Sequence, residues 1–260
     1  ETFARTKGEG RIAFMPFMTA GFPTLDASIS IMKAMVEAGA DGIEVGIPFS
    51  DPLADGPVIQ RSSQEALAGG MTLAGTLDLI AAARVDRPVV VFSYLNPVFR
   101  YGFDRFLRDA EALGVAGLLL TDLPAGSDPG IESLVRESPL DLIRLIAPTT
   151  TADRLQAITT GAEGFLYLVA RLGVTGKSRE LDTGLEEYVA RVRAASPLPL
   201  AVGFGISTPQ QAVAVAHLAD GVVVGSALVE RLGREGPAAA GRMLAELRLA
   251  LDRADQERAG

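Results

Sequence analysis

Glu44 is the first residue whose type and surroundings suggest chemistry. It lies in the segment DGIEVGIPF, residues 41–49, with Gly42 and Gly46 two positions away on either side. If this segment is a strand, all three residues point to one face and the apolar residues between them point to the other. Burial of an unpaired carboxyl group is costly and raises its pKa, which suits a general acid and base near neutral pH. The alternative interpretation is a structural glutamate paired with a buried arginine.

A second set of carboxylates follows in SDPLADG, residues 50–56. Asp51 precedes a proline and Asp55 precedes Gly-Pro, so turn formation explains both residues as well as chemistry does. The residue pattern alone does not choose between them. Asp122, at the end of another apolar run, is equally compatible with helix capping and with a supporting role near a site.

Two glycine segments predict a binding site for a phosphate group. GFGIS (residues 203–207) and GSAL (residues 225–228) each follow an apolar run and open a helical pattern. Glycines allow close approach to backbone N–H groups, and a helix N-terminus carries partial positive charge. Gly205, Gly225 and the Ser226 hydroxyl are the expected anion contacts. The alternative is that these glycines only form tight turns.

Composition excludes several other kinds of chemistry. The chain has no Cys and a single His, which excludes thiol nucleophiles, thiolate metal sites and His-rich metal sites, so no metal is expected. That histidine, His217, lies in the last turn of a predicted helix, and we assign it no catalytic role. With 24 basic and 32 acidic residues the net charge is −8, and no basic cluster indicates nucleic-acid binding.

The elements that must position these residues alternate regularly. Short apolar runs, each followed by a turn and a longer helix-period segment, recur about eight times in the 260 residues. This pattern predicts parallel strands joined by helices, and the number of units favours a closed (β/α)8 TIM barrel over a doubly wound sheet. The predicted strands are residues 12–19, 42–46, 88–94, 117–121, 141–147, 164–168, 198–203 and 221–224.

The barrel prediction also places the ends of the chain and the active face. We expect one domain over residues 1–260, an extra helix before residue 12 and a long C-terminal helix over residues 237–255. The loops after the strands form the active face, and those at 47–58 and 171–185 are long enough to act as lids. Every apolar run is shorter than the roughly 18 residues that span a bilayer, and no signal peptide is evident, so we expect a cytoplasmic protein without membrane attachment.

Several of these motifs together resemble the tryptophan synthase α-subunit family. They are FMTAGFP, DGIEVGIPFSDPLADGPVIQ, FSYLNP, LLLTDLP, LIAPTT, YLVARLGVTG, VGFGIS and GSAL, in this order over nearly the whole chain. The resemblance implies a (β/α)8 barrel that cleaves indole-3-glycerol phosphate to indole and glyceraldehyde 3-phosphate, a lyase reaction of L-tryptophan biosynthesis. It also implies a partner β subunit in an α2β2 heterotetramer, with pyridoxal phosphate in that partner and no cofactor in this chain.

The resemblance assigns roles to individual residues. It places the catalytic glutamate at Glu44 and the catalytic aspartate at Asp55, which decides between the two loop aspartates. The substrate contacts that it implies are Phe17, Phe92, Tyr94, Leu119, Ile146, Tyr167, Thr175 and Phe204, and the phosphate contacts are Gly176, Gly205, Gly225 and Ser226.

Two residues depart from the family pattern. Thr121 stands where Ala or Pro is expected, and Ala170 stands where Ser is usual. Both changes concern packing of the pocket or of a loop rather than the acid–base pair. Three other functions fit parts of the pattern: a free-standing lyase that needs no β subunit, a phosphosugar isomerase or aldolase, and an idle subunit that only activates β. Retention of Glu44 and Asp55 argues against the idle subunit.

Overall fold

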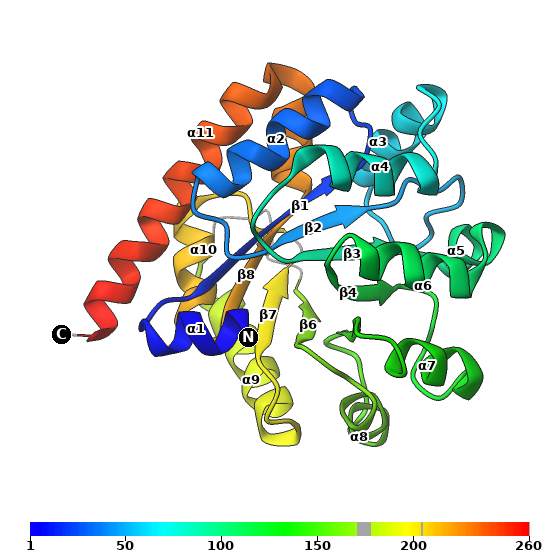
Figure 1. Ribbon diagram of the computed structural model, residues 1–260. Helices are drawn as coiled ribbons and strands as arrows, with labels where there is room; N and C mark the ends of the chain where they lie inside the picture. Colours follow the sequence, from blue (N-terminus) through cyan, green and yellow to red (C-terminus); the bar gives the residue numbers. More distant parts are fainter. Residues whose placement is uncertain (171–177, 204, 260) are drawn as a thin grey trace.

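Eight parallel strands form a closed barrel in which each strand pairs with the next and β8 pairs with β1 (Figure 1). The computed structural model describes residues 1–170, 178–203 and 205–259. The predicted TIM barrel is confirmed. Its strands are β1 (Ala13–Thr19), β2 (Ile43–Gly46), β3 (Val89–Ser93), β4 (Val115–Leu120), β5 (Asp141–Ile146), β6 (Leu166–Val169), β7 (Leu200–Gly203) and β8 (Gly221–Val224).

Helices surround the barrel (Figure 1). They are α1 (Thr2–Gly8), α2 (Leu25–Glu37), α3 (Pro57–Ala68), α4 (Leu73–Ala83), α5 (Leu95–Tyr101), α6 (Phe103–Ala112), α7 (Pro129–Arg136), α8 (Ala152–Thr160), α9 (Ser178–Ala195), α10 (Pro209–Ala216) and α11 (Ser226–Ala259). The last of these is interrupted at Gly236, where φ is 80°, and the part after the break begins at Pro237 as predicted.

The structure adds helices where the sequence pattern indicated only loops. The predicted loop 47–58 ends at Pro57, where α3 begins, and α9 begins at Ser178, inside the predicted loop 171–185. Helices α5 and α7 were not predicted either. Pro57 and Pro129 occupy the first turns of α3 and α7, a position where proline is favoured because its missing N–H has no helical partner.

The end of the barrel where the strands begin is covered by α1 (Figure 1). The ring of Phe3 packs 5.2 Å from that of Phe165 and lies so close to Gly221 that an added Cβ there would come within 2.9 Å of it. Glycine at 221 therefore leaves room for the Phe3 ring between strand and helix. Substrate chemistry belongs to the opposite end, where the strands finish.

Across the described part of the chain, no individual helix has the length and apolar character needed to cross a bilayer. Helices α3 and α4 meet that test only as a pair, and they are bent by 95° relative to each other.

Candidate active site

Glu44 lies in the barrel lumen, as the alternation of the strand predicts. It is the register partner of Phe17 in β1 and of Val90 in β3, and it is 0% exposed. Neither carboxyl oxygen has a hydrogen-bond partner within the described residues, so the alternative of a buried ion pair with arginine is not observed there. Burial raises the pKa of Glu44 to about 8, which keeps the group protonated at neutral pH.

Asp55 reaches the same region from the loop between β2 and α3. The Tyr94 hydroxyl donates a 3.1 Å hydrogen bond to Asp55 Oδ2 and accepts one of 3.0 Å from the backbone N–H of Ala54. Burial raises the pKa of Asp55 to about 6, and the hydrogen bond from Tyr94 opposes this rise. Asp51, in contrast, is exposed and accepts a hydrogen bond from its neighbour Ser50.

Tyr167 in β6 lies near both carboxyl groups. The side chain is 4% exposed, and its pKa is raised well above the ordinary value by burial and then by the negative charges of Glu44 and Asp55. A Cβ added at Gly203 in β7 would lie 2.3 Å from the Tyr167 hydroxyl oxygen. Only glycine at 203 therefore allows the phenol to occupy this place.

A small cavity of about 30 Å³ joins Asp55 to two of the candidate phosphate residues, and Glu44 is not among the residues that line it. This volume holds about one water molecule. Two of the walls, Phe17 and Phe92, meet edge to face with ring centroids 5.5 Å apart. The lining residues are Phe17, Asp55, Ile59, Phe92, Tyr167, Gly225 and Ser226. Sequence reasoning missed Ile59, because it lies on α3, which was not predicted.

The segment after β8 has the geometry expected of an anion site. Ser226 begins α11 and lines the cavity together with Gly225, whose carbonyl accepts a 3.0 Å hydrogen bond from the N–H of Val229. Gly205, between β7 and α10, is exposed and has a φ of 91°, which glycine adopts freely. Three predicted contacts, Thr175, Gly176 and Phe204, lie outside the described residues.

The remaining predicted pocket residues differ in the faces that they occupy. Leu119 is the register partner of Phe92, so it shares the lumen face, and it is 0% exposed. In β5 the partner of Tyr167 is Leu145, whereas Ile146 pairs with Leu168. Because neighbouring residues of a strand point to opposite faces, Ile146 lies on the face away from Tyr167. The register thus adds Leu145, which the sequence motif had not indicated, to the lumen side chains near Tyr167.

Two residues at the end of β4 and one after β6 have clear local roles. Asp122 accepts a 2.7 Å hydrogen bond from the N–H of Leu95, the first residue of α5, so it caps a neighbouring helix. Thr121 donates to the carbonyl of Ser93 over 3.3 Å. Ala170 is 4% exposed, and its N–H donates to the carbonyl of Gly203 over 2.9 Å, which continues the strand pairing.

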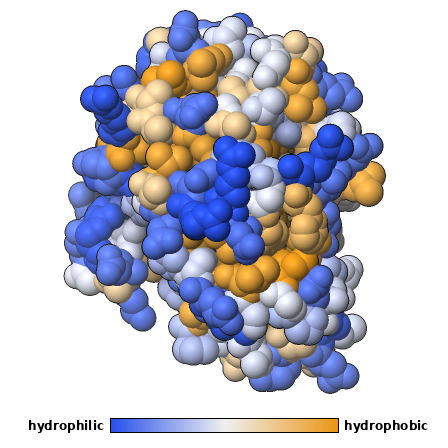
Figure 2. All heavy atoms as spheres, turned by 45° about the vertical axis from the view of Figure 1, so that its right-hand side comes forward, coloured by the Kyte–Doolittle hydropathy of each residue, from blue (hydrophilic) through white to orange (hydrophobic). Residues whose placement is uncertain are grey.

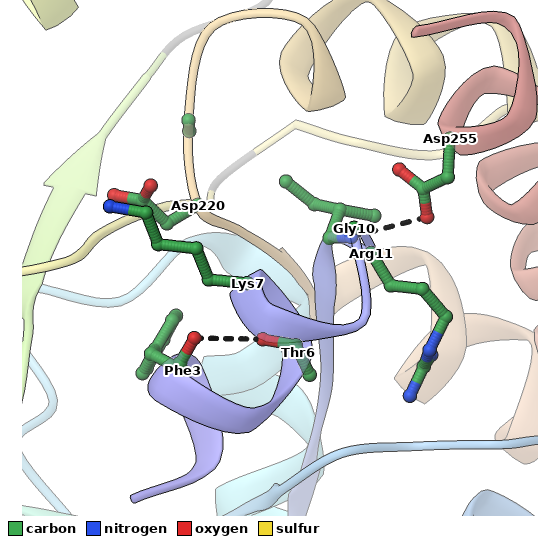
Figure 3. A pocket seen from close by; sticks show the side chains of 9 residues that line it. Phe3, Thr6, Lys7, Gly10, Arg11, Asp220 and Asp255 are labelled. Atoms are coloured by element: carbon green, nitrogen blue, oxygen red, sulfur yellow. Dashed lines mark hydrogen bonds between the residues drawn. The ribbon is translucent and has the colours of Figure 1, made fainter. Parts of the chain in front are cut away.

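Another pocket lies at the end of the barrel where the strands begin (Figure 3). It has a volume of about 330 Å³, and polar groups around it bind one another: Thr6 donates to the carbonyl of Phe3, and Asp255 accepts from the N–H of Ile12. Side chains at this end of a TIM barrel serve stability rather than catalysis. The described residues contain no group of three or more His, Cys, Asp or Glu side chains that could hold a metal ion.

Comparisons with known proteins agree with this geometry. A family model described as tryptophan synthase alpha chain matches residues 3–256. The tryptophan synthase alpha chain of Rhizorhabdus wittichii is 46% identical over 265 residues, covering 100% of this chain and 98% of the relative. That of Chloroflexus aurantiacus is also 46% identical, over 91% of this chain and 90% of the relative.

Solved structures lead to the same family. The tryptophan synthase subunit alpha of Legionella pneumophila superposes with a TM-score of 0.89 at 37% identity, covering 97% of both chains. A chain of tryptophan synthase from M. tuberculosis, in an aminoacrylate-bound form, has a TM-score of 0.87 at 37% identity, covering 96% of this chain and 97% of that one. The chain therefore belongs to the tryptophan synthase alpha chain family.

Proposed function

We propose that Glu44 and Asp55 are the acid–base pair with which this chain cleaves indole-3-glycerol phosphate. As a member of its family the chain is a lyase, and its products are indole and glyceraldehyde 3-phosphate. The observation that carries the residue assignment is the buried carboxyl group of Glu44. It has no hydrogen-bond partner in the described structure, and its pKa is raised to about 8.

The raised pKa suits the first step of the cleavage. The bond between indole C3 and the side chain breaks only if C3 can accept the bonding electrons. Protonated Glu44 donates its proton to C3, which converts the ring to an electron-accepting indoleninium. The resulting Glu44 carboxylate then removes the proton of the adjacent side-chain hydroxyl. The C–C electrons return to the ring, the aldehyde forms, and Glu44 is protonated again.

Asp55 stabilises the positive charge that develops at the ring nitrogen. Its pKa of about 6 leaves it mostly ionised at neutral pH, so it can accept the ring N–H hydrogen bond in the transition state. General acid–base catalysis of this kind contributes a factor of about 10²–10⁴ in rate. The phosphate group binds at Gly176, Gly205, Gly225 and Ser226. These contacts, together with Thr175, anchor the substrate so that its C3 atom faces Glu44.

The ring itself fits among apolar and aromatic walls. Phe17, Phe92 and Tyr167 line the cavity and Leu119 shares their face, so they form the core of the substrate pocket that we propose. Tyr94 contributes through Asp55 rather than as a wall, and the family resemblance adds Phe204. Ile146, which the resemblance also implies, faces away from Tyr167, so Leu145 takes its place in the pocket that we propose.

The partner of this chain is a β subunit, and we place it on the active face in an α2β2 heterotetramer. Leu53, two residues before Asp55, is 92% exposed, and a groove of about 420 Å³ lined by Phe49, Met71 and Pro97 lies in the same part of the molecule. Apolar residues form separate patches between hydrophilic ones on the side that carries α5, α6 and α7 (Figure 2). Pyridoxal phosphate belongs to the β subunit, and binding of β raises the activity of this chain through the lid loops 47–58 and 171–185.

The deciding experiment is an indole-release assay on wild type and Glu44→Gln, each with and without the β subunit. We expect turnover by the wild type that β increases, and a loss of at least about 10²-fold in the variant. Near-normal turnover by Glu44→Gln would refute the acid–base assignment. A wild-type rate that β does not change would favour the free-standing lyase, and wild type without turnover would favour the idle activator.

A further inference from the structure

Helix α3 holds the backbone of Asp55, in addition to the contact that Tyr94 makes with its carboxyl group. The Gln60 side chain donates a 2.8 Å hydrogen bond from Nε2 to the backbone carbonyl of Asp55. The backbone N–H of Gln60 donates over 3.0 Å to the carbonyl of Gly56, the N-cap residue of the helix. Gln60 therefore binds two consecutive residues at the point where the loop after β2 becomes α3.

The side-chain bond from Gln60 takes the place of a side-chain cap at the start of α3. The N-cap residue Gly56 makes no side-chain hydrogen bond to the helix, because glycine has no side chain. Glycine also adopts more backbone conformations than other residues, so it does not by itself fix the direction in which the loop enters the helix. The orientation of Asp55 relative to α3 therefore depends on the Gln60 amide.

The turn of α3 that carries Gln60 is anchored to the barrel. The hydroxyl oxygens of Ser62 and Thr19 lie 2.7 Å apart, and the two residues are 0% and 1% exposed. The single proton of the Ser62 hydroxyl goes to the carbonyl of Ile59 over 2.8 Å, so Thr19 at the end of β1 is the donor to Ser62. Ile59 lines the same cavity as Asp55. Gln60 thus acts from a part of the helix that is held against β1.

We propose that Gln60 is a positioning residue for Asp55. The backbone N–H of Asp55 donates to the carbonyl of Pro52 over 3.0 Å, and its Oδ2 atom accepts the hydrogen bond from Tyr94. The bond from Gln60 to the carbonyl adds a third fixed point, on the helix side of the residue. Together these contacts set the direction in which the carboxylate meets the ring N–H of the substrate. The inference rests on the proposed role of Asp55 in the cleavage.

The test compares Gln60→Met with Gln64→Met. Methionine has as many side-chain atoms in its chain as glutamine but no N–H donor, so the first variant removes the bond to Asp55 and keeps the length. Gln64 is the matched control, because it is also an exposed glutamine and lies one turn later on the same helix. The measurement is kcat and KM for indole release in the presence of the β subunit, under conditions in which urea denaturation shows each variant to be folded.

We expect Gln60→Met to lower kcat about fivefold, the effect of one neutral hydrogen bond. KM should change little, because Asp55 stabilises charge that develops only in the transition state, whereas the contacts to the phosphate group and the ring remain. Gln64→Met should have the kcat and KM of the wild type.

A double variant separates positioning of Asp55 from a general structural effect. In an Asp55→Asn background the carboxylate that Gln60 orients is missing, so Gln60→Met should lower kcat no further. A purely structural contribution of Gln60 would instead lower kcat by the same factor in both backgrounds.

Three outcomes would overturn the inference: an unchanged kcat in Gln60→Met, an equal loss in Gln64→Met, or an undiminished effect in the Asp55→Asn background. Asp55→Asn alone separates failure of the inference from failure of the proposed function. If Asp55→Asn keeps wild-type turnover, the proposed function fails. If it loses turnover while Gln60→Met behaves as wild type, only the inference about Gln60 fails.

Discussion

Phe17 and Glu44 are register partners on β1 and β2, so their side chains lie next to each other on the lumen face. The Phe17 ring also extends over Gly46, where an added Cβ would lie 2.6 Å from Cζ of the ring. The residue that lines the cavity therefore also supplies part of the apolar surroundings of Glu44. The strand pair thus contributes both to the pocket that we propose for the indole ring and to the raised pKa of Glu44, the proposed catalytic acid.

Gly46→Ala should therefore damage catalysis by displacing the Phe17 ring. The new methyl group overlaps the ring, and overpacking of this kind costs about 1–3 kcal/mol. We expect kcat/KM for indole release to fall roughly tenfold or more, because the ring that lines the pocket moves. Adding Phe17→Leu removes the overlapping ring atoms and should restore the midpoint of chemical denaturation. Gly8→Ala is the control, because an added Cβ meets nothing within 4 Å there. Unchanged kinetics in Gly46→Ala would contradict the role of the Phe17 ring.

The pH dependence of kcat/KM should be bell-shaped. Asp55 must be ionised, so the rate rises as the pH passes about 6, and Glu44 must be protonated, so the rate falls as the pH passes about 8. The two limbs belong to the pair as a whole, because interacting groups titrate together. The profile is measured with wild type and the slow Asp55→Asn variant, in which the acidic limb should disappear. A wild-type rate that keeps rising to pH 10 would exclude protonated Glu44 as the acid.

Asp55→Asn should lower kcat strongly while largely preserving substrate affinity. The amide can still bind Tyr94 but cannot stabilise positive charge on the ring nitrogen, so the loss falls on the transition state. We expect a loss smaller than that of Glu44→Gln but still near 10²-fold. Asp51→Asn provides the matched control, because Asp51 is exposed and belongs to the same loop. Equal losses in the two loop variants would show that the loop, rather than the Asp55 carboxylate, is responsible.

Strand periodicity was sufficient to predict the barrel and the inward orientation of Glu44. The alternation of small and apolar residues in 42–46 encodes the faces directly, because the period of a strand does not depend on its neighbours. Asp55 is different. Its residue type and its Gly-Pro context match a turn as well as Asp51 does. What distinguishes the two is a hydrogen bond from Tyr94, 39 residues away along the chain.

Two of the helices missed by pattern reasoning, α3 and α7, begin at a proline. Pro57, which follows Asp55 and Gly56, suggested a turn, although it stands in the first turn of α3. In α7, Asp128 caps the helix by accepting the N–H of Ile131, and Pro129 stands in its first turn. The position of Ile59 in the cavity could not be inferred, because α3 was not predicted. The face of Ile146 depends on the strand register, which no local pattern reveals.

Glu44 should make the protein less stable as the pH rises. Its folded pKa of about 8 lies above the ordinary value of 4.5, so the folded state holds the proton more tightly than the unfolded state. Between these two values the folded state binds more protons, and the free energy of unfolding falls by up to about 1.4 kcal/mol per pH unit from this group. Glu44→Gln should flatten this dependence. Urea denaturation of both proteins between pH 5 and 8 measures it, and parallel curves would show that Glu44 does not titrate as described.

Arg248 links the C-terminal helix to the beginning of β1 at the end of the barrel away from the site. It is 6% exposed, donates to the carbonyl of Ile12 over 3.0 Å, and pairs with Asp255, which is 4% exposed, over 3.1 Å. Arg248→Ala leaves a buried carboxylate without this cation, so we expect a loss of about 3–5 kcal/mol in the free energy of unfolding. Arg253→Ala, which changes an exposed arginine of the same helix, should alter the free energy of unfolding by less than about 0.5 kcal/mol.

The activity of both variants, measured where they are folded, should be that of the wild type. We expect kcat to be unchanged, because this end of the barrel supports the fold and does not touch substrate. A large loss of kcat in folded Arg248→Ala would show instead that the two ends of the barrel are coupled.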